Sequence, residues 1–266
     1  MNIKKILQEY KIEPKKRLGQ SFLINNNIAN HIVATCEIGN RDIIVEVGAG
    51  FGVLTELLLK QAKHVFAIEK DPFIFTFLKQ HFSEVKNLSL LNEDVLQLNL
   101  KDIVPAGSVK LVSNLPYSIT SDFLYWLLDN RTHIRRCILT LQKEAAQRIL
   151  APFKTKEYCA LSVLFQFYMT SKHLLSIPGR SFYPVSRVAS EVIRISPQNN
   201  KKKVDNKFFN KLTKRAFSQR RKMLKNSLGL KMNILAGINL SRRPESLSTE
   251  EFTHLANALQ QKGIIL

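Results

Sequence analysis

The chain has 266 residues and is 45% apolar, which suffices for one large core or two modest ones and argues against a protein that is disordered throughout. Its 40 lysines and arginines outnumber 21 acids, giving a formal net charge of +19, so nucleic acid is favoured as partner over a membrane surface. The three cysteines lack paired or Cys-x-x-Cys spacing, so we expect no disulfide and no metal site. The first residues carry no apolar signal-peptide core and no apolar run reaches about 18 residues, so we expect a cytoplasmic protein without a membrane span.

A basic arm, residues 1–24, begins the chain and ends in Gly19-Gln20-Ser21-Phe22-Leu23. Basic arms are often solvated and frayed. A free tail would expose Phe22 and Leu23 to water, so we expect this arm to fold back over a pocket. Its candidates for phosphate contact are Lys15, Lys16 and Arg17.

A strand, a glycine turn and a helix follow a helix that is predicted over residues 26–38. Residues 43–47 are a short β-branched run typical of a buried parallel strand. The turn Gly48-Ala49-Gly50-Phe51-Gly52 lets the backbone approach a ligand, and the start of the next helix supplies free N–H groups. It departs from the dinucleotide pattern Gly-x-Gly-x-x-Gly by ending one residue sooner. We interpret it as a ligand-binding turn, with plain packing as the alternative.

Acidic residues follow the next two predicted strands. Strand 65–68 leads to Glu69, 21 residues after Gly48, where a doubly wound sheet holds a nucleoside ribose by its hydroxyl groups. A surface ion pair is the alternative for this acid. Asp94 follows strand 88–91 at the same carboxyl edge, and there it can accept a hydrogen bond from an adenine amino group.

The fourth predicted strand, residues 109–113, delivers the motif Asn114-Leu115-Pro116-Tyr117 to that edge. The asparagine supplies a carbonyl acceptor, the proline fixes the backbone, and the tyrosine can stack on a flat base. Taken alone, the motif is also ordinary turn chemistry. Because four strand ends bring acids, glycines and this motif to one cleft, the sequence predicts a doubly wound α/β sheet with a nucleoside site.

The rest of the chain continues the sheet and then changes composition. Helices are predicted over 123–128 and 143–150, strands over 136–141 and 190–195, and the apolar run 161–169 with Trp126, Phe165 and Phe167 is interpreted as core.

After a polar linker, residues 201–243 contain 14 lysines and arginines and the single acid Asp205. Residues 217–226 place apolar side chains at helical spacing opposite a run of cations, Arg220, Arg221 and Lys222. We therefore predict two domains, residues 1–198 and residues 199–266, the second suited to phosphate contact.

With these motifs in order, the chain resembles the ribosomal RNA adenine N6,N6-dimethyltransferase family, which includes the kasugamycin-sensitivity methyltransferases of bacteria. The resemblance runs from end to end. It is carried by the segments 17–23, 46–52, 69–71, 93–94, 114–117, 142–144, 220–222 and 243–247. It implies a Rossmann-like methyltransferase sheet followed by a small carboxyl-terminal helical domain.

The resemblance also implies S-adenosylmethionine as methyl donor, with no metal. The positions that match the family's donor site are Gln20, Ser21, Leu23, Gly48, Gly50, Glu69, Asp94 and Asn114. Two departures stand out: Ser21 replaces the asparagine that the family commonly has, and the stretch 183–190 contains fewer prolines than the family pattern.

The reaction that the resemblance implies is direct transfer of methyl groups to N6 of two adjacent adenosines in a 3′-terminal hairpin of 16S ribosomal RNA, within an immature 30S particle. The catalytic motif would be Asn114, Leu115, Pro116 and Tyr117. Tyr117 would stack on an unstacked base, and Phe182 would cover its other face. The enzyme is expected to act as a monomer.

Three alternatives remain open at this point. Large-subunit ribosomal RNA methyltransferases of the antibiotic-resistance type share the fold and the motifs. A ribosome assembly factor could keep the fold without catalysis, although a pure binder has no use for a complete donor site. A DNA adenine methyltransferase would act on the same nitrogen, and charge alone does not separate the two polyanions.

Overall fold

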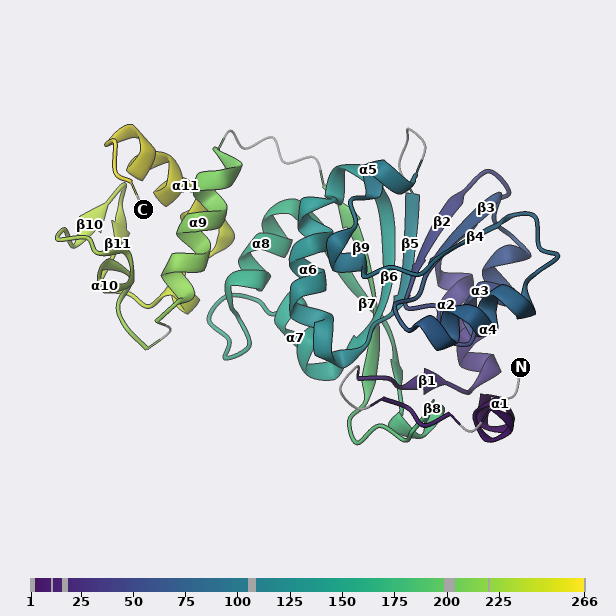
Figure 1. Cartoon of the computed structure of the whole chain (residues 1–266). Coiled ribbons are helices and arrows are strands. Elements are labelled where there is room, and N and C mark those ends of the chain that lie inside the picture. Colours follow the sequence, from purple (N-terminus) through teal and green to yellow (C-terminus); the bar gives the residue numbers. More distant parts are fainter. Residues whose placement is uncertain are drawn as a thin grey trace. The chain divides into compact units, whose positions relative to one another are not determined.

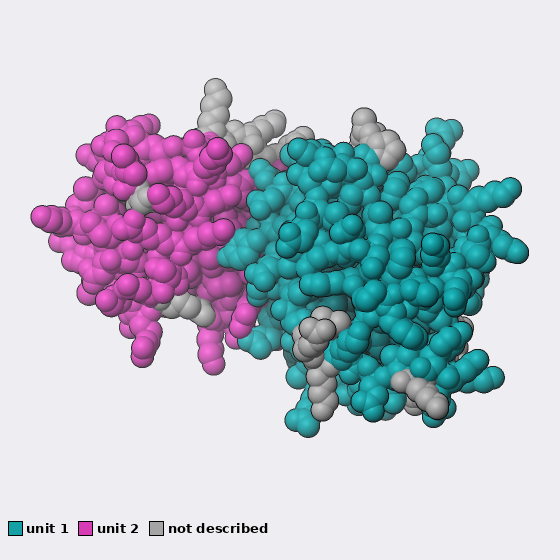
Figure 2. All heavy atoms as spheres, viewed as in Figure 1, with its two compact units in different colours: residues 1–146, 172–197 teal, residues 147–171, 198–266 magenta. Residues whose placement is uncertain are grey.

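The computed structural model of the chain describes residues 3–10, 12–15, 19–104, 109–198, 204–219 and 221–265. The chain divides into two compact units (Figure 2). The first comprises residues 1–146 and 172–197, and the second comprises residues 147–171 and 198–266. The second unit thus takes in residues 147–171, which the predicted 199–266 domain leaves out, because helix α8 (Ala160–Tyr168) packs against the helices of that unit.

A seven-stranded sheet is the centre of the fold (Figure 1). Its order is β4 (Leu88–Leu91), β3 (His64–Ile68), β2 (Ile43–Val47), β5 (Val109–Asn114), β6 (Ile134–Gln142), β9 (Ser190–Pro197) and β7 (Met169–Ile177). The first five strands are parallel, and β9 is antiparallel to β6. The chain leaves β2 toward β3 and later returns to β5 on the other side, which opens a crevice beyond the carboxyl ends of β2 and β5.

Helices cover the sheet (Figure 1). The helices described up to residue 150 are α1 (Ile3–Glu9), α2 (Asn26–Thr35), α3 (Val53–Leu59), α4 (Pro72–His81), α5 (Leu100–Ile103), α6 (Thr120–Asp129) and α7 (Lys143–Leu150). Short 3-10 turns are η2 (Val95–Gln97), η3 (Tyr117–Ile119), η4 (Arg131–His133), η5 (Gly179–Ser181) and η6 (Pro244–Ser246). One apolar cluster joins the buried faces of α1 to α4 to alternate residues of the strands, among them Ile44, Val65 and Val112. Burial of these side chains drives the layer together.

The strands predicted at 43–47, 65–68, 88–91, 109–113, 136–141 and 190–195 are confirmed, with small differences at their ends. The helix predicted over 26–38 ends sooner, at Thr35, and Glu37 takes a positive φ of 49° that breaks the helix. Strand β7 has no counterpart in the prediction. It lies at the edge of the sheet and most of its side chains are at least partly exposed, so its sequence carries no apolar run.

The second unit is built mainly of helices: α8 (Ala160–Tyr168), α9 (Asn206–Phe217), α10 (Leu224–Leu228) and α11 (Thr249–Gln261), with a hairpin of β10 (Ile234–Leu235) and β11 (Ile238–Asn239). Its core is aromatic. The rings of Phe167 on α8 and Phe209 on α9 lie 4.2 Å apart, and those of Phe217 and Phe252 stack at 5.8 Å. Phe165 and Trp126 are buried as predicted.

The helical face predicted over 217–226 is interrupted. Helix α9 ends at Phe217, where the Ser218 hydroxyl donates to the Arg215 carbonyl, and α10 begins only at Leu224. Both ends bury an apolar side chain, while the described polar residues between them, Ser218, Gln219, Arg221 and Lys222, are exposed and lie in turns or bends. In the described ranges, none of the helices is long and apolar enough to cross a membrane.

Candidate functional site

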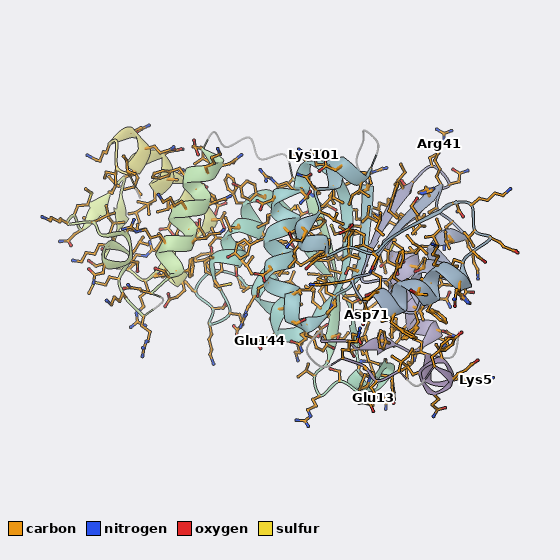
Figure 3. All side chains as sticks on the ribbon, in the orientation of Figure 1. Lys5, Glu13, Arg41, Asp71, Lys101 and Glu144 are labelled. Carbon is orange, nitrogen blue, oxygen red and sulfur yellow. The ribbon has the colours of Figure 1, made fainter. Side chains whose placement is uncertain are left out.

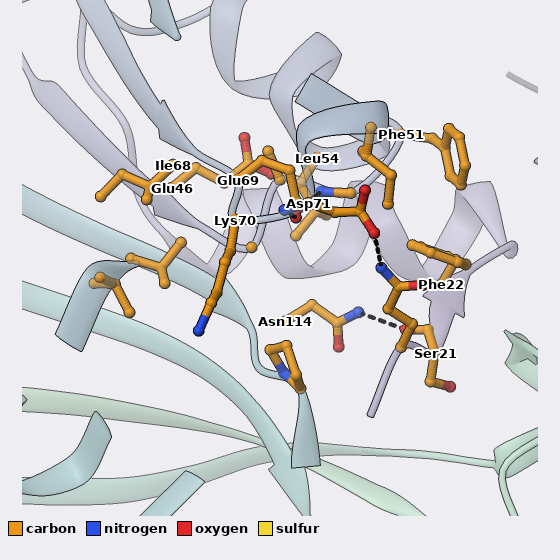
Figure 4. A pocket seen from close by; sticks show the side chains of 18 of the residues that line it. Ser21, Phe22, Glu46, Phe51, Leu54, Ile68, Glu69, Lys70, Asp71 and Asn114 are labelled. Carbon is orange, nitrogen blue, oxygen red and sulfur yellow. Dashed lines mark hydrogen bonds between the residues drawn. The ribbon is translucent and has the colours of Figure 1, made fainter. Parts of the chain in front are cut away.

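A pocket lies beyond the carboxyl ends of β2, β3 and β5, in the first unit (Figure 4). It encloses about 1020 Å³ of space, part of it open to solvent. Of the residues predicted for the donor site, it brings together Gln20, Ser21, Leu23, Gly48, Gly50, Glu69, Asp94 and Asn114. Pro116 also lines it, whereas Leu115, Tyr117 and Phe182 do not. The crevice therefore gathers the glycines, carboxylates and side-chain amide of the predicted donor site along one open cavity.

The glycine turn forms one wall of this pocket. Gly50 has a φ of 55°, a left-handed value that side chains disfavour, and a Cβ added there would lie 3.3 Å from the Phe22 ring. Its N–H donates to the Glu69 carboxylate at 2.9 Å. The turn therefore lets the Phe22 ring pack directly against the backbone of Gly50, and it fixes an acid on the neighbouring strand end.

Glu69 is held rigidly. One carboxylate oxygen accepts the N–H of Gly50 and the other accepts the N–H of Asp71, each at 2.9 Å. The side chain is 8% exposed. Burial raises the pKa of Glu69 above its ordinary value, while the two backbone amides oppose that rise. The result is an acceptor of fixed position, suited to neutral hydroxyl groups.

A second buried acid, Glu46, lines the pocket and has no role in the sequence-based prediction. It is 1% exposed and accepts a hydrogen bond of 2.6 Å from the Thr55 hydroxyl. Burial raises its pKa to about 8, the Thr55 hydrogen bond opposes this, and repulsion from Glu69 adds to it. Glu46 lies two residues before Gly48, the first glycine of the turn, and this position in the sequence could have indicated that its side chain lines the pocket.

Asp71, which is labelled in Figure 3, holds the amino-terminal arm against the pocket (Figure 4). One of its oxygens accepts from Lys15 Nζ at 2.7 Å and from Gln20 Nε2 at 3.0 Å, and the other caps α4 through the N–H of Phe73. Burial favours the neutral acid, but these donors outweigh it and lower the pKa of Asp71. The arm does fold back over a pocket, as expected. The role of Asp71 went unpredicted because Asp-Pro is an ordinary helix start.

Asp94 also lines the pocket, and the side chain of Lys70 lies beside it. Its Oδ2 lies 2.6 Å from Lys70 Nζ, and its Oδ1 accepts the N–H of Leu96, which caps η2. These contacts fix the carboxylate at the rim of the pocket, so it can act as an acceptor with a defined direction.

The side-chain amide of Asn114 is oriented by the arm. Its Nδ2 donates to the backbone carbonyl of Ser21 at 3.3 Å, which directs Oδ1 away from Ser21 (Figure 4). The contact uses the main chain, so it does not depend on the asparagine that the family commonly has at position 21. Further along the motif, the Pro116 carbonyl accepts the N–H of Ile119 within the turn. That leaves Leu115 as the better candidate for a main-chain acceptor.

The two predicted base-stacking rings differ in accessibility. Tyr117, in η3, is half-buried and its hydroxyl lies 3.2 Å from those of Ser186 and Ser190. Phe182 is 1% exposed and belongs to the apolar core, where β8 (Phe182–Tyr183) pairs with β1 (Phe22–Leu23). The expectation that Phe182 covers a target base does not fit this arrangement, because neither face of its ring is free.

The predicted RNA-contacting cations lie in both units. Lys15 is engaged by Asp71, while Arg221 and Lys222 in the second unit are exposed. The other three, Lys16, Arg17 and Arg220, lie outside the described residues. Within the described ranges there is no group of three or more histidine, cysteine, aspartate or glutamate side chains arranged to hold a metal ion.

Comparison with known proteins gives this site its context. The model of the ribosomal RNA adenine dimethylase family matches residues 12–261. The chain belongs to this family. A ribosomal RNA small subunit methyltransferase A of Bacillus cytotoxicus is 37% identical over 96% of this chain and 94% of that protein. The protein of the same name from a Sulfurihydrogenibium species is 36% identical over 94% of this chain and 98% of its own length.

Solved structures support the same fold. A dimethyladenosine transferase from Plasmodium falciparum matches with a TM-score of 0.77 at 23% identity, over 91% of this chain and 98% of that one. The 23S ribosomal RNA methyltransferase ErmE matches with a TM-score of 0.69 at 23% identity, over 90% of this chain and 100% of that one. The expected Rossmann-like methyltransferase sheet and membership of an adenine dimethylase family are therefore confirmed.

Proposed function

We propose that this protein transfers methyl groups from S-adenosylmethionine to N6 of two adjacent adenosines in a 3′-terminal hairpin of 16S ribosomal RNA. It would do so in the cytoplasm, as a monomer, on an immature 30S particle. The proposal is supported by family membership and by curated relatives that are named small subunit methyltransferases and match over nearly the whole chain. The reaction would give N6,N6-dimethyladenosine.

The pocket residues fit the proposed donor. Glu69 would accept hydrogen bonds from the ribose hydroxyl groups, and Asp94 would accept one from the adenine amino group. Gly48 would lie at the amino-acid end of the donor, and the positive φ values of Gly48 and Gly50 give this turn a backbone course that side chains disfavour. The Gln20–Leu23 segment would cover the donor. When bound, S-adenosylmethionine supplies a methyl group on a positively charged sulfur.

The chemical difficulty lies in the target, because the N6 lone pair of adenine is delocalised into the ring. The Asn114 Oδ1 atom and the Leu115 carbonyl would each accept a hydrogen bond from an N6–H and so favour a pyramidal nitrogen. As N6 bonds the methyl carbon, the sulfur–methyl bond would break, S-adenosylhomocysteine would leave, and one N6 proton would pass to water. These acceptors are fixed before the substrate arrives, since Ser21 holds the Asn114 amide. Tyr117 would stack on the extruded base.

One observation carries the proposal: an amide whose donor end is already engaged presents its oxygen at the mouth of a nucleoside-sized pocket that also holds a fixed carboxylate. A ribosome assembly factor without catalysis would need neither group in that position.

The test is mass spectrometry of nucleosides after the protein and S-adenosylmethionine are incubated with undermodified 30S particles, 50S particles or naked ribosomal RNA. We expect dimethyladenosine in the 30S sample alone. Product confined to 50S particles would move the protein to the large-subunit branch. Donor binding without product on any substrate would favour the assembly-factor alternative.

A further inference from the structure

The hydroxyl of Tyr117 is held between two serines that lie outside the catalytic motif. We propose that Ser186 and Ser190 are positioning residues that clamp the Tyr117 ring, and that this clamp is what allows the second methyl transfer to follow the first. The inference rests on the proposed function, because it deepens the role of Tyr117 at the target base.

The hydrogen bonds of the clamp form an ordered chain. Tyr117 Oη donates to Ser186 Oγ at 3.2 Å, and Ser186 Oγ in turn donates to the Val188 carbonyl at 2.8 Å. Ser190 Oγ lies 3.2 Å from the same phenol oxygen. Because the Tyr117 proton is already directed at Ser186, the Ser190 hydroxyl acts as the donor in this last contact. The phenol therefore has one donor and one acceptor partner, which fixes the far edge of the ring.

The clamp is itself anchored. Ser190 is fully buried at the start of β9, so its position is set by the sheet. Ser186 donates its N–H to the Gly179 carbonyl at 3.1 Å, and a Cβ at Gly179 would lie only 2.0 Å from the Ser186 carbonyl oxygen. Only glycine permits this approach. The loop that carries Ser186 thus packs directly on η5, and Ser186 lies within the stretch 183–190 that departs from the family pattern.

A rigid ring matters more for the second transfer than for the first. Unmodified N6 carries two hydrogens, so hydrogen bonds to both the Asn114 oxygen and the Leu115 carbonyl help to orient the base in the first step. Monomethylated N6 keeps one hydrogen and adds a methyl that must be directed away from the acceptors. A base stacked on a loosely held ring therefore loses more productive orientations in the second step. Removing the clamp should accordingly change the ratio of products more than the binding of RNA.

The first measurement follows the products of S186A/S190A with time on undermodified 30S particles. We expect monomethyladenosine to rise at least about fivefold relative to dimethyladenosine, a shift of about 1 kcal/mol in the second step. Y117F should show the same shift, and the triple variant should be no worse than Y117F, because the serines act through the phenol oxygen. The control is S89A, which removes a serine hydroxyl that bonds His64 at 2.9 Å on β4.

A second measurement does not depend on activity. In protein labelled with ¹³C at the tyrosine ring ε carbons, the Tyr117 signal is assigned by its loss in Y117F. We expect it to shift or broaden in S186A/S190A and to stay unchanged in S89A. An unmoved signal, or a wild-type ratio of products, overturns the clamp. A wild-type protein that methylates no ribosomal RNA, with the Tyr117 signal still moved, overturns the proposed function and leaves the clamp standing.

Discussion

At the scale of single residues, the site depends on polar groups whose partners are settled before any ligand binds. Asn114 shows this most directly, because its donor end meets the Ser21 carbonyl and its acceptor end is left for the substrate. Glu69 follows the same principle through two backbone amides. Such preorganisation removes the reorganisation that a mobile group would need during the reaction.

Replacing Asn114 by alanine tests this directly. The variant loses the oxygen that draws on N6 but keeps the backbone turn, so we expect methyl transfer to fall by about 100- to 1000-fold while RNA affinity stays within about twofold. Single-turnover transfer and filter binding on the same 30S preparation would measure both. Activity equal to that of the wild type would refute the assignment.

Glu46 makes a prediction about pH. Its pKa in the folded protein, about 8, lies above the ordinary value of 4.5, so the folded state binds the proton more tightly than the unfolded state. The stability of the wild type is therefore reduced as the pH rises from about 4.5 to about 8. Glu46→Gln keeps an acceptor for Thr55 and does not titrate.

Between about pH 4.5 and 8, the free energy of unfolding of Glu46→Gln should therefore rise relative to that of the wild type by at most about 1.4 kcal/mol per pH unit. Urea titrations at several pH values between 5 and 8 would show the divergence. Glu84→Gln, at an exposed position, serves as the matched control. Parallel stability curves for Glu46→Gln and the wild type would contradict the assignment.

At the scale of elements, the sequence predicted most of the buried strands and missed features that depend on exposed or polar residues. The buried strands were predictable, because runs such as 43–47 and 65–68 are almost entirely apolar, as strands buried on both faces of a parallel sheet must be. Strand β7 escaped because an edge strand has little to bury. The break between α9 and α10 escaped prediction because helical spacing of apolar residues does not reveal where a helix ends. The Asp71 contacts escaped because they join residues more than 50 positions apart.

Those contacts predict that the amino-terminal arm controls retention of the donor. Lys15→Ala combined with Gln20→Ala removes both donors from Asp71 but leaves its cap on α4 intact. We expect the Kd for S-adenosylhomocysteine to rise about 3- to 30-fold, since one or two hydrogen bonds to a charged group are lost.

Calorimetric titration measures that Kd, and hydrogen exchange across residues 20–23 should quicken in parallel. Lys60→Ala is the matched control, because it removes an equally charged side chain from an exposed pair with Glu56. Unchanged affinity and unchanged exchange in the double variant would show that the arm is held without this contact.

At the scale of the whole molecule, the positive charge is distributed unevenly along the sequence. Residues 201–243 hold 14 of the 40 lysines and arginines with a single acid, and the described part of this segment lies in the second unit. The pocket proposed to hold the methyl donor is lined by residues of the first unit. This separation allows RNA affinity and donor affinity to be changed independently.

Arg221→Ala combined with Lys222→Ala tests that independence, since both side chains are exposed at the turn between α9 and α10. If both contact phosphates, RNA affinity should fall and the slope of log K against log salt should flatten by about 1 to 2, because fewer counterions are released on binding. The affinity for the methyl donor should not change.

The control pair, Lys60→Ala with Lys63→Ala, removes the same charge from the first unit. It separates the loss of a local contact from a change in the electrostatic field of the whole protein. An equal loss in both pairs would mean that net charge alone attracts the RNA, whereas a loss confined to Arg221 and Lys222 assigns this turn to the RNA interface.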